Sequence, residues 1–174
     1  MSSPRSEFLQ GMRDISPVLP GVLPFGLIAG VTAVSVGLSI VQTIGMSIFV
    51  VAGASQLAAL ELIQNGSIIG IILLTVAMIN IRHMMYSATI APHFVKHPLI
   101  WRLFLPYLLI DQVFLFASLR YNREPEMPYK RAYYLGLATM ILTGWHSATI
   151  IGALLGTQIP PAWGLDFVIP LVFM

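Results

Sequence analysis

The sequence predicts an all-α polytopic membrane protein, a transmembrane helix bundle with kinked or broken helices. Of the 174 residues, 57% are hydrophobic and 9% are charged, whereas a soluble domain carries about 25% charged residues. Apolar runs long enough to cross a bilayer as helices cover nearly the whole chain. We therefore expect a single transmembrane domain over 1–174, with five full spans and a truncated sixth at about 18–35, 40–63, 68–90, 100–119, 132–155 and 165–174.

Charge and cysteine content narrow the class of function. Nine Lys and Arg against seven Asp and Glu leave a net charge of +2, which in a soluble protein would suggest a nucleic-acid partner. Here the basic residues follow the ends of apolar runs and report membrane topology, so no nucleic acid is expected. The chain has no cysteine, which excludes a disulfide framework, a thiolate metal site and a thiol nucleophile.

The first span follows a polar lead, residues 1–17, that we expect to be cytoplasmic and uncleaved. Span 18–35 is dense in helix breakers, among them Pro24 and Gly26, which should kink or interrupt the helix. An interrupted helix presents free N–H groups, and in transporters such a helix start binds a substrate's carboxylate. A kink that serves only helix packing is the alternative.

Small residues predict two places of close helix packing. Gly26 and Gly30 in the first span have the G-x-x-x-G spacing, and so do Gly152 and Gly156 in the fifth. Without a side chain at these positions, two helix backbones can approach closely.

The second span, 40–63, carries Ser55 and Gln56 within a run of small residues, and Glu61 near its end. Gln56 lies deep enough to need a partner inside the bundle. Glu61 is either solvated at the interface or a proton carrier within the membrane. The polar link 64–67 is a tight turn, so we expect the second and third spans to form a helical hairpin.

The third span, 68–90, carries Asn80, Arg82 and His83 beyond its middle. A guanidinium facing lipid at that depth would cost from about 3 to over 10 kcal/mol. Polar residues follow two opposite faces of this helix, so we expect it in the middle of the bundle rather than at the rim. The polar residues either line a transport path or brace neighbouring helices.

The fourth span, 100–119, carries Asp111 close to its centre. Counted by helical rise, Arg82 and Asp111 each lie within roughly 5 Å of the bilayer midplane, so we predict an ion pair between them. Our hypothesis is that Asp111 offsets the charge of Arg82 in the empty site and exchanges partners when substrate or a proton arrives.

Basic residues predict the orientation of the chain. The loop 120–131 holds four of the nine Lys and Arg. If the spans alternate, this loop and the N-terminal lead share one side with six Lys or Arg, while Lys96 and Arg102 lie on the other side. By the positive-inside rule, the N-terminus is then cytoplasmic.

Histidines raise two further questions. His146, in a polar stripe of the span 132–155, is either a proton relay or a buried neutral histidine bonded to a threonine or a carbonyl. His93 and His97 have the i, i+4 spacing of a metal pair, but no third ligand is evident and we expect no metal site. The last apolar run, 165–174, stops about halfway across a bilayer, so we expect the natural protein to continue or a partner to complete it.

Several motifs, taken in chain order, match one family. They are Pro24-Phe25-Gly26, Ala52-Gly53-Ala54-Ser55-Gln56, Asn80-x-Arg82-His83 with Tyr86, Asp111-Gln112-Val113-Phe114, and Gly164-x-Asp166-Phe167 with Pro170. On these motifs the chain resembles the AzlC family of branched-chain amino acid permeases, the large subunit of a two-component exporter. It departs from the family in having Asp111-Gln112 where an acidic pair is usual, and in lacking further apolar segments after Met174.

The resemblance implies a multi-pass permease of the bacterial inner membrane, without enzymatic activity or cofactor. It implies export of leucine, isoleucine and valine, which we expect to be coupled to the proton motive force, with a small membrane subunit of the AzlD type as partner. A zwitterionic substrate needs a donor for its carboxylate, an acceptor for its ammonium and an apolar pocket. The candidate substrate-binding residues are Pro24, Gly26, Ser55, Gln56, Asn80, Arg82 and Asp111, beside an apolar wall of Met78, Met84, Met85 and Phe114. The candidates for proton coupling are Asp111, His83, His146 and Glu61.

Two other functions remain open at this point. In a membrane scaffold without transport activity, the polar residues would only hold helices together. In an intramembrane serine hydrolase, Ser55 after Gly53 and Ala54 would be the nucleophile, with His146 or His83 as its base.

Overall fold

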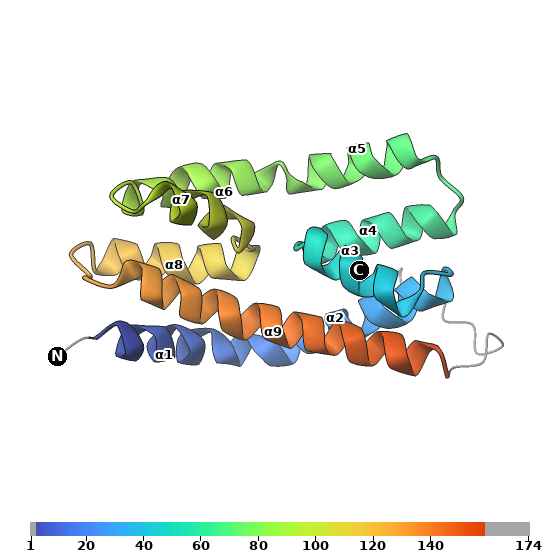
Figure 1. The fold of residues 1–174 in the computed structure, drawn as a ribbon, viewed down its shortest axis with the longest axis horizontal. Helices are drawn as coiled ribbons and strands as arrows, with labels where there is room; N and C mark the ends of the chain where they lie inside the picture. The colour runs from blue at the N-terminus through green and yellow to red at the C-terminus, as the bar shows by residue number, and fades with distance from the viewer. Residues whose placement is uncertain (1–2, 159–174) are drawn as a thin grey trace. The chain divides into compact units, whose positions relative to one another are not determined.

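The computed structural model describes residues 3–158, which fold into helices joined by short connections (Figure 1). The chain forms two compact units. Unit 1 comprises Met1–Leu19 and Ile81–Thr143, and unit 2 comprises Pro20–Asn80 and Gly144–Met174. All nine Lys and Arg of the sequence fall within the residue ranges of unit 1. The prediction of one transmembrane domain over the whole chain stays a prediction.

Unit 1 is built around the first half of a long helix, α9 (Lys130–Gly156). Its other elements are α1 (Pro4–Ile15), the 3-10 turn η1 (Ser16–Val18), α6 (Arg82–Ile90), the 3-10 turn η2 (Ala91–His93), α7 (Leu99–Tyr107) and α8 (Asp111–Arg123). A Cβ at Gly11 of α1 would overlap the carbonyl oxygen of Tyr133, and a Cβ at Gly136 would overlap that of Phe8. The backbones of α1 and α9 are therefore in direct contact.

Buried tyrosines connect the elements of unit 1 through their hydroxyls. Tyr134 donates to the carbonyl oxygen of Leu105 at 2.8 Å, which ties α9 to α7. Tyr133 donates to Oδ2 of Asp14 at 2.8 Å and ties α9 to α1. A phenol buried in apolar surroundings needs such a partner, so these bonds select one packing of the helices.

Among its described residues, unit 2 holds the second half of α9 and four further helices. They are α2 (Leu19–Ser35), which begins at the boundary between the units, α3 (Ile40–Phe49), α4 (Gly53–Gln64) and α5 (Ile69–Asn80). A Cβ at Gly30 would overlap the carbonyl oxygen of Thr149, and a Cβ at Gly152 would overlap that of Leu27. The close packing predicted from the two G-x-x-x-G segments is confirmed, because these segments bring α2 and α9 together.

Three helical stretches of the described residues are long and apolar enough to cross a membrane: Pro4–Ser35, Ile69–His93 and Lys130–Gly156. The all-α class is thus confirmed, and helices at 18–35 and 132–155 are present as predicted. The count of five full spans is not confirmed. The predicted sixth run, 165–174, lies outside the described residues.

The second and fourth predicted spans each divide into two short helices. Span 40–63 becomes α3 and α4, of 10 and 12 residues, and span 100–119 becomes α7 and α8, of 9 and 13 residues. The backbone turns out of the helix before each second member, with extended dihedral angles at Ala52 and Ile110. Nine residues of helix reach about 14 Å, roughly half of a hydrocarbon layer of about 30 Å.

The predicted interruption of the first span is wrong, since α2 runs unbroken through Pro24. Proline removes one N–H from the helix, but the remaining bonds and the packing of α2 on α9 keep the helix intact. The third predicted span does change helix midway, because α5 ends at Asn80 and α6 begins at Arg82.

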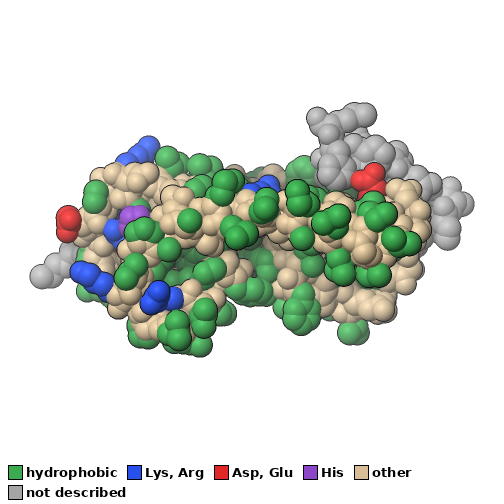
Figure 2. All heavy atoms as spheres, turned by 90° about the horizontal axis from the view of Figure 1, so that it is seen from above, with side chains coloured by type: hydrophobic (Ala, Val, Ile, Leu, Met, Phe, Trp, Pro, Cys, Tyr) green, Lys and Arg blue, Asp and Glu red, His purple; other side chains and the backbone are tan. Residues whose placement is uncertain are grey.

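The predicted central position of the third span is also wrong. Only 6% of the most apolar part of Ile69–His93 is buried. Leu73, Leu74 and Met84 are each more than 60% exposed, and Figure 2 shows hydrophobic side chains spread widely over the face that it draws. Most apolar side chains of this span therefore lie on the surface of the described residues.

Candidate functional site

Arg82 and Asp111 form the predicted ion pair in unit 1. Nη2 of Arg82 lies 3.1 Å from Oδ2 of Asp111, and the two side chains are 30% and 41% exposed. Each residue is the first of its helix, α6 and α8. The positive end of the helix dipole favours the carboxylate at the start of α8 and disfavours the guanidinium at the start of α6, so Asp111 offsets the unfavourable placement of Arg82.

Each partner of this pair also keeps one polar atom that has no hydrogen-bond partner among the described residues. These atoms are Nε of Arg82, a donor, and Oδ1 of Asp111, an acceptor. Both are buried, so a ligand reaches them only if the pair shifts. The site thus combines an unused donor and an unused acceptor beside a bond that can open.

Aromatic rings lie next to the ion pair on the same two helices. Tyr86 of α6 and Phe114 of α8 stack with their ring centroids 4.2 Å apart and their planes 11° apart. His83 meets Tyr86 edge to face at 5.6 Å. Phe114 thus lies on the helix that Asp111 begins, whereas Met84 and Met85 are 71% and 65% exposed, and the predicted apolar wall of the substrate site stays a prediction.

Ser55 and Asn80 form a second polar contact, in unit 2. Ser55 is fully buried on α4. Its Oγ donates a hydrogen bond of 2.5 Å to Oδ1 of Asn80, at the end of α5. Gln56, 2% exposed, uses its amide nitrogen to donate to the carbonyl oxygens of Val50 at 2.8 Å and Met46 at 3.2 Å. Gln56 therefore satisfies carbonyl groups at the end of α3, which explains its burial without a substrate.

Pro24 and Gly26 have packing roles in unit 2. A Cβ at Gly26 would lie 2.8 Å from the Cβ of Ala148, so Gly26 lets α2 approach α9. Because α2 is continuous at Pro24, no helix start is available there for a carboxylate. The packing alternative for these two residues is the one that the structure supports.

The predicted proton carriers lie in different surroundings. His146 has its Nδ1 2.8 Å from Oγ of Ser47, a residue that is 3% exposed on α3. The alternative of a bonded histidine fits, with a serine as partner in place of a threonine or a carbonyl. Glu61 is exposed in the last turn of α4, which fits its interfacial alternative. Asp111 is the candidate that forms a salt bridge, to Arg82.

Sequence reasoning missed Ser47 and Trp145. The indole of Trp145 lies against Gly53, the first residue of α4, where a Cβ would be 2.6 Å from Cη2. Its Nε1 is buried and has no hydrogen-bond partner among the described residues, and the start of α4 has no side-chain cap. The only signal was indirect: a tryptophan within an apolar span has an N–H that needs an acceptor.

Comparisons with known proteins agree with this description of a helical membrane protein. The model of the family described as AzlC protein matches residues 17–159. Inner membrane protein YgaZ of Escherichia coli (strain K12) is 25% identical over 177 residues, which cover 96% of this chain and 70% of that protein. An uncharacterized membrane protein of Helicobacter pylori (strain ATCC 700392 / 26695) is 25% identical over 175 residues, 97% of this chain and 75% of that protein.

An uncharacterized membrane protein of Archaeoglobus fulgidus is 27% identical over 156 residues, which cover 87% of this chain and 64% of that protein. No solved structure matches the chain. The family model covers most of the sequence. The matched residues include the Arg82–Asp111 ion pair, the Ser55–Asn80 contact and the Ser47–His146 contact. The chain therefore belongs to the AzlC family of membrane proteins.

Proposed function

We propose that this chain is the transport subunit of an exporter of branched-chain amino acids, driven by the proton motive force across a bacterial inner membrane. It works with a small membrane subunit of the AzlD type. The observation that carries the proposal is the Arg82–Asp111 pair, with an unused donor on one side chain and an unused acceptor on the other. A zwitterion carries the complementary groups, a carboxylate and an ammonium.

Substrate binding then exchanges one ion pair for two. The substrate's carboxylate takes the guanidinium of Arg82, and its ammonium takes the carboxylate of Asp111, so neither charge is left without a partner in a low-dielectric site. Phe114 and Tyr86 offer the apolar surface for a branched side chain. A residue without an apolar side chain would leave that surface uncovered and bind more weakly.

Asp111 also supplies the proton coupling in this proposal. When a proton binds Asp111, the carboxylate becomes neutral and its bond to Arg82 weakens, so the ion pair opens. Asp111 therefore binds either a proton or the ammonium of the substrate, but not both at once. Such mutually exclusive binding is what the exchange of a proton for a substrate requires. Only one carboxylate is needed, which fits the glutamine at position 112.

Leucine counterflow in proteoliposomes tests the proposal, with the chain and its small partner reconstituted together. We expect Arg82→Ala to abolish counterflow, and Arg123→Gln, which removes an exposed charge from the same unit, to preserve it. Asp111→Asn should retain some counterflow but lose its dependence on a pH gradient.

Two results would contradict the proposal in different ways. Counterflow that survives Arg82→Ala would remove the ion pair from the substrate path. The absence of flux for leucine, isoleucine and valine in folded, reconstituted wild-type protein would favour a scaffold.

The hydrolase alternative is not favoured. Ser55, the predicted nucleophile, donates its hydroxyl to Asn80, and His146, one of the two predicted bases beside His83, is bonded to Ser47 instead. Only the counterflow experiment distinguishes a scaffold without transport activity from a transporter.

A further inference from the structure

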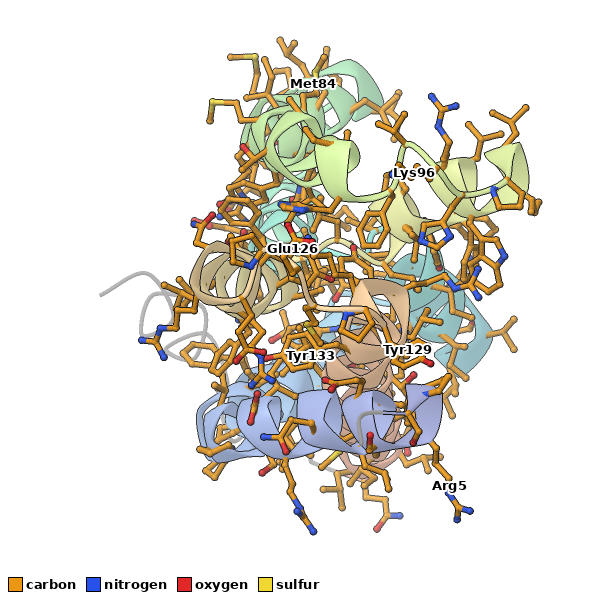
Figure 3. The ribbon with its side chains drawn as sticks, turned by 90° about the vertical axis from the view of Figure 1, so that its left-hand side faces the viewer. Arg5, Met84, Lys96, Glu126, Tyr129 and Tyr133 are labelled. Carbon is orange, nitrogen blue, oxygen red and sulfur yellow. The ribbon has the colours of Figure 1, made fainter. Side chains whose placement is uncertain are left out.

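A cavity of about 690 Å³ opens at one end of unit 1, where the segment after α6 meets the start of α9. Its lining has three basic side chains and two imidazoles, and none of its twelve described residues is acidic. Figure 3 looks onto this end of the unit and labels Lys96 and Tyr129. The lining residues central to the argument are His93, Lys96, His97, Tyr129, Lys130 and Arg131.

The positive charge of this cavity is not neutralised by neighbouring carboxylates. Nζ of Lys130 lies 3.1 Å from Nδ1 of His93 and 5.4 Å from the ring centre of Tyr121. The guanidinium of Arg131 lies 4.6 Å above the ring of Trp101. Both salt bridges found among the described residues involve other basic side chains.

Further signs of a positive potential come from the surrounding groups. Burial lowers the pKa of His97, and the charge of Arg131 lowers it further. The two acidic residues of the adjoining loop lie elsewhere: Glu124 pairs with Arg120, and Glu126 is exposed without lining the cavity. An anion in the cavity would therefore meet little competition.

The cavity lies where two candidate membrane spans end. His93 is the last residue of the candidate span Ile69–His93, and Lys130 is the first residue of the candidate span Lys130–Gly156. The contact between these two residues places the ends of both spans side by side. Trp101 beside Arg131 is the kind of aromatic residue that lies at the membrane interface. Where these two candidate spans cross a bilayer, the basic groups at their ends lie at the depth of lipid headgroups.

A second, apolar crevice of unit 1 adjoins the basic cavity at one lining residue. It measures about 230 Å³, runs between α6 and α7, and shares Val95 with the basic cavity. Apart from Ser87, Arg102 and Tyr134, its lining is aliphatic, aromatic or proline. The crevice is thus suited to a hydrocarbon chain, and the neighbouring cavity to an anion.

We propose that the basic cavity and the apolar crevice together bind one anionic phospholipid, with its phosphate among Lys96, Lys130 and Arg131 and the first part of an acyl chain along α6 and α7. A phosphate alone would use only the cavity. The adjacent hydrocarbon site is what favours a lipid over a soluble anion.

Native mass spectrometry of the detergent-solubilised full chain tests this site. We expect wild-type protein to retain phosphatidylglycerol in preference to phosphatidylcholine with the same acyl chains. Each basic side chain removed should weaken retention roughly fivefold, so Lys96→Gln with Arg131→Gln should nearly remove the preference. Arg123→Gln is the matched control, because Arg123 is exposed and does not line the cavity. Lys96→Gln alone changes only an exposed side chain, so it tests the site without threatening the fold.

Two further samples separate a lipid from a soluble anion. Ala91→Phe fills the crevice and should reduce phosphatidylglycerol retention while leaving the basic cavity intact. Inorganic phosphate at millimolar concentration should not displace the lipid. Equal retention of the two lipids by wild-type protein would overturn the proposal, as would a double variant that behaves like Arg123→Gln. Displacement by phosphate with no effect of Ala91→Phe would assign the cavity to a soluble anion and reject the lipid.

Discussion

Arg82 and Asp111 illustrate what single residues reveal in an apolar sequence. A charged side chain inside a membrane is costly enough that its partner can be sought by depth alone, and the pair at 3.1 Å confirms that reasoning. The depth argument worked because both residues begin helices in one compact unit.

A double-mutant cycle measures the coupling between these two side chains. Arg82→Ala and Asp111→Ala should each lower the free energy of unfolding, since each leaves a charge without its partner. The double variant should lose less than the sum, by on the order of 1 kcal/mol, because partial exposure weakens the pair. Thermal unfolding in one detergent provides the measurement, and strictly additive losses would show that the two charges act independently.

Other residues could not be assigned from sequence, because their partners are set by tertiary contacts. Gln56 was predicted to contact substrate, yet its amide reaches the carbonyl groups of Met46 and Val50. This contact exists only because α3 ends at Phe49 and α4 begins at Gly53. Periodicity predicts a polar residue in the interior but not which group it bonds.

The positions at which helices break also depend both on local sequence and on contacts with distant residues. Pro24 and Gly26 predicted a break in the first span, but α2 is continuous. The breaks occur instead around Val51 and Leu109, where neither proline nor glycine occupies the broken residues. Gly53 directly follows the first break and Pro106 lies just before the second, and Gln56 of α4 bonds the freed carbonyl oxygen of Val50 at the end of α3.

Glycine packing gives a prediction at the level of elements. Gly30→Ala should force α2 away from α9, because the added Cβ would overlap the carbonyl oxygen of Thr149. We expect a loss of about 1–3 kcal/mol in the free energy of unfolding. Gly21→Ala in the same helix is the control, since nothing lies within 4 Å of a Cβ there, and it should be neutral or slightly stabilising. Equal effects of the two substitutions on the unfolding temperature would argue against close backbone contact.

At the scale of the whole molecule, the short helices change the expected topology. The contacts of Lys130 with His93 and of Arg131 with Trp101 place the segment 91–101 beside the start of α9. The prediction that Lys96 and Arg102 lie opposite the loop 120–131 is therefore wrong. We therefore predict that α7 and α8 enter the membrane and return to the same side, because each is too short to cross it. We predict that this arrangement puts eight of the nine Lys and Arg on one side of the membrane, with Arg82 as the remaining one.

Cysteine labelling in oriented membrane vesicles distinguishes the two topologies, and the absence of native cysteine makes single substitutions clean reporters. We expect Lys96→Cys and Arg123→Cys to react with a membrane-impermeant maleimide from the cytoplasmic side, and Ser67→Cys from the opposite side. Five alternating spans would reverse Ser67 and Lys96 relative to Arg123. That reversed labelling pattern would contradict the prediction that α3 with α4, and α7 with α8, each enter the membrane and return to the same side.

The sequence by itself determined the class of the protein, its family resemblance, the glycine-packed helices and the Arg82–Asp111 pair. Composition, short-range spacing and the high cost of charge in lipid are strong enough to be visible without a structure. The tertiary structure alone decided which apolar stretches divide into half-length helices, which loops share an end of unit 1, and where a basic cavity adjoins an apolar crevice. A helix that crosses a bilayer and one that turns back have the same local hydrophobicity, and contacts between residues distant in the sequence decide between them.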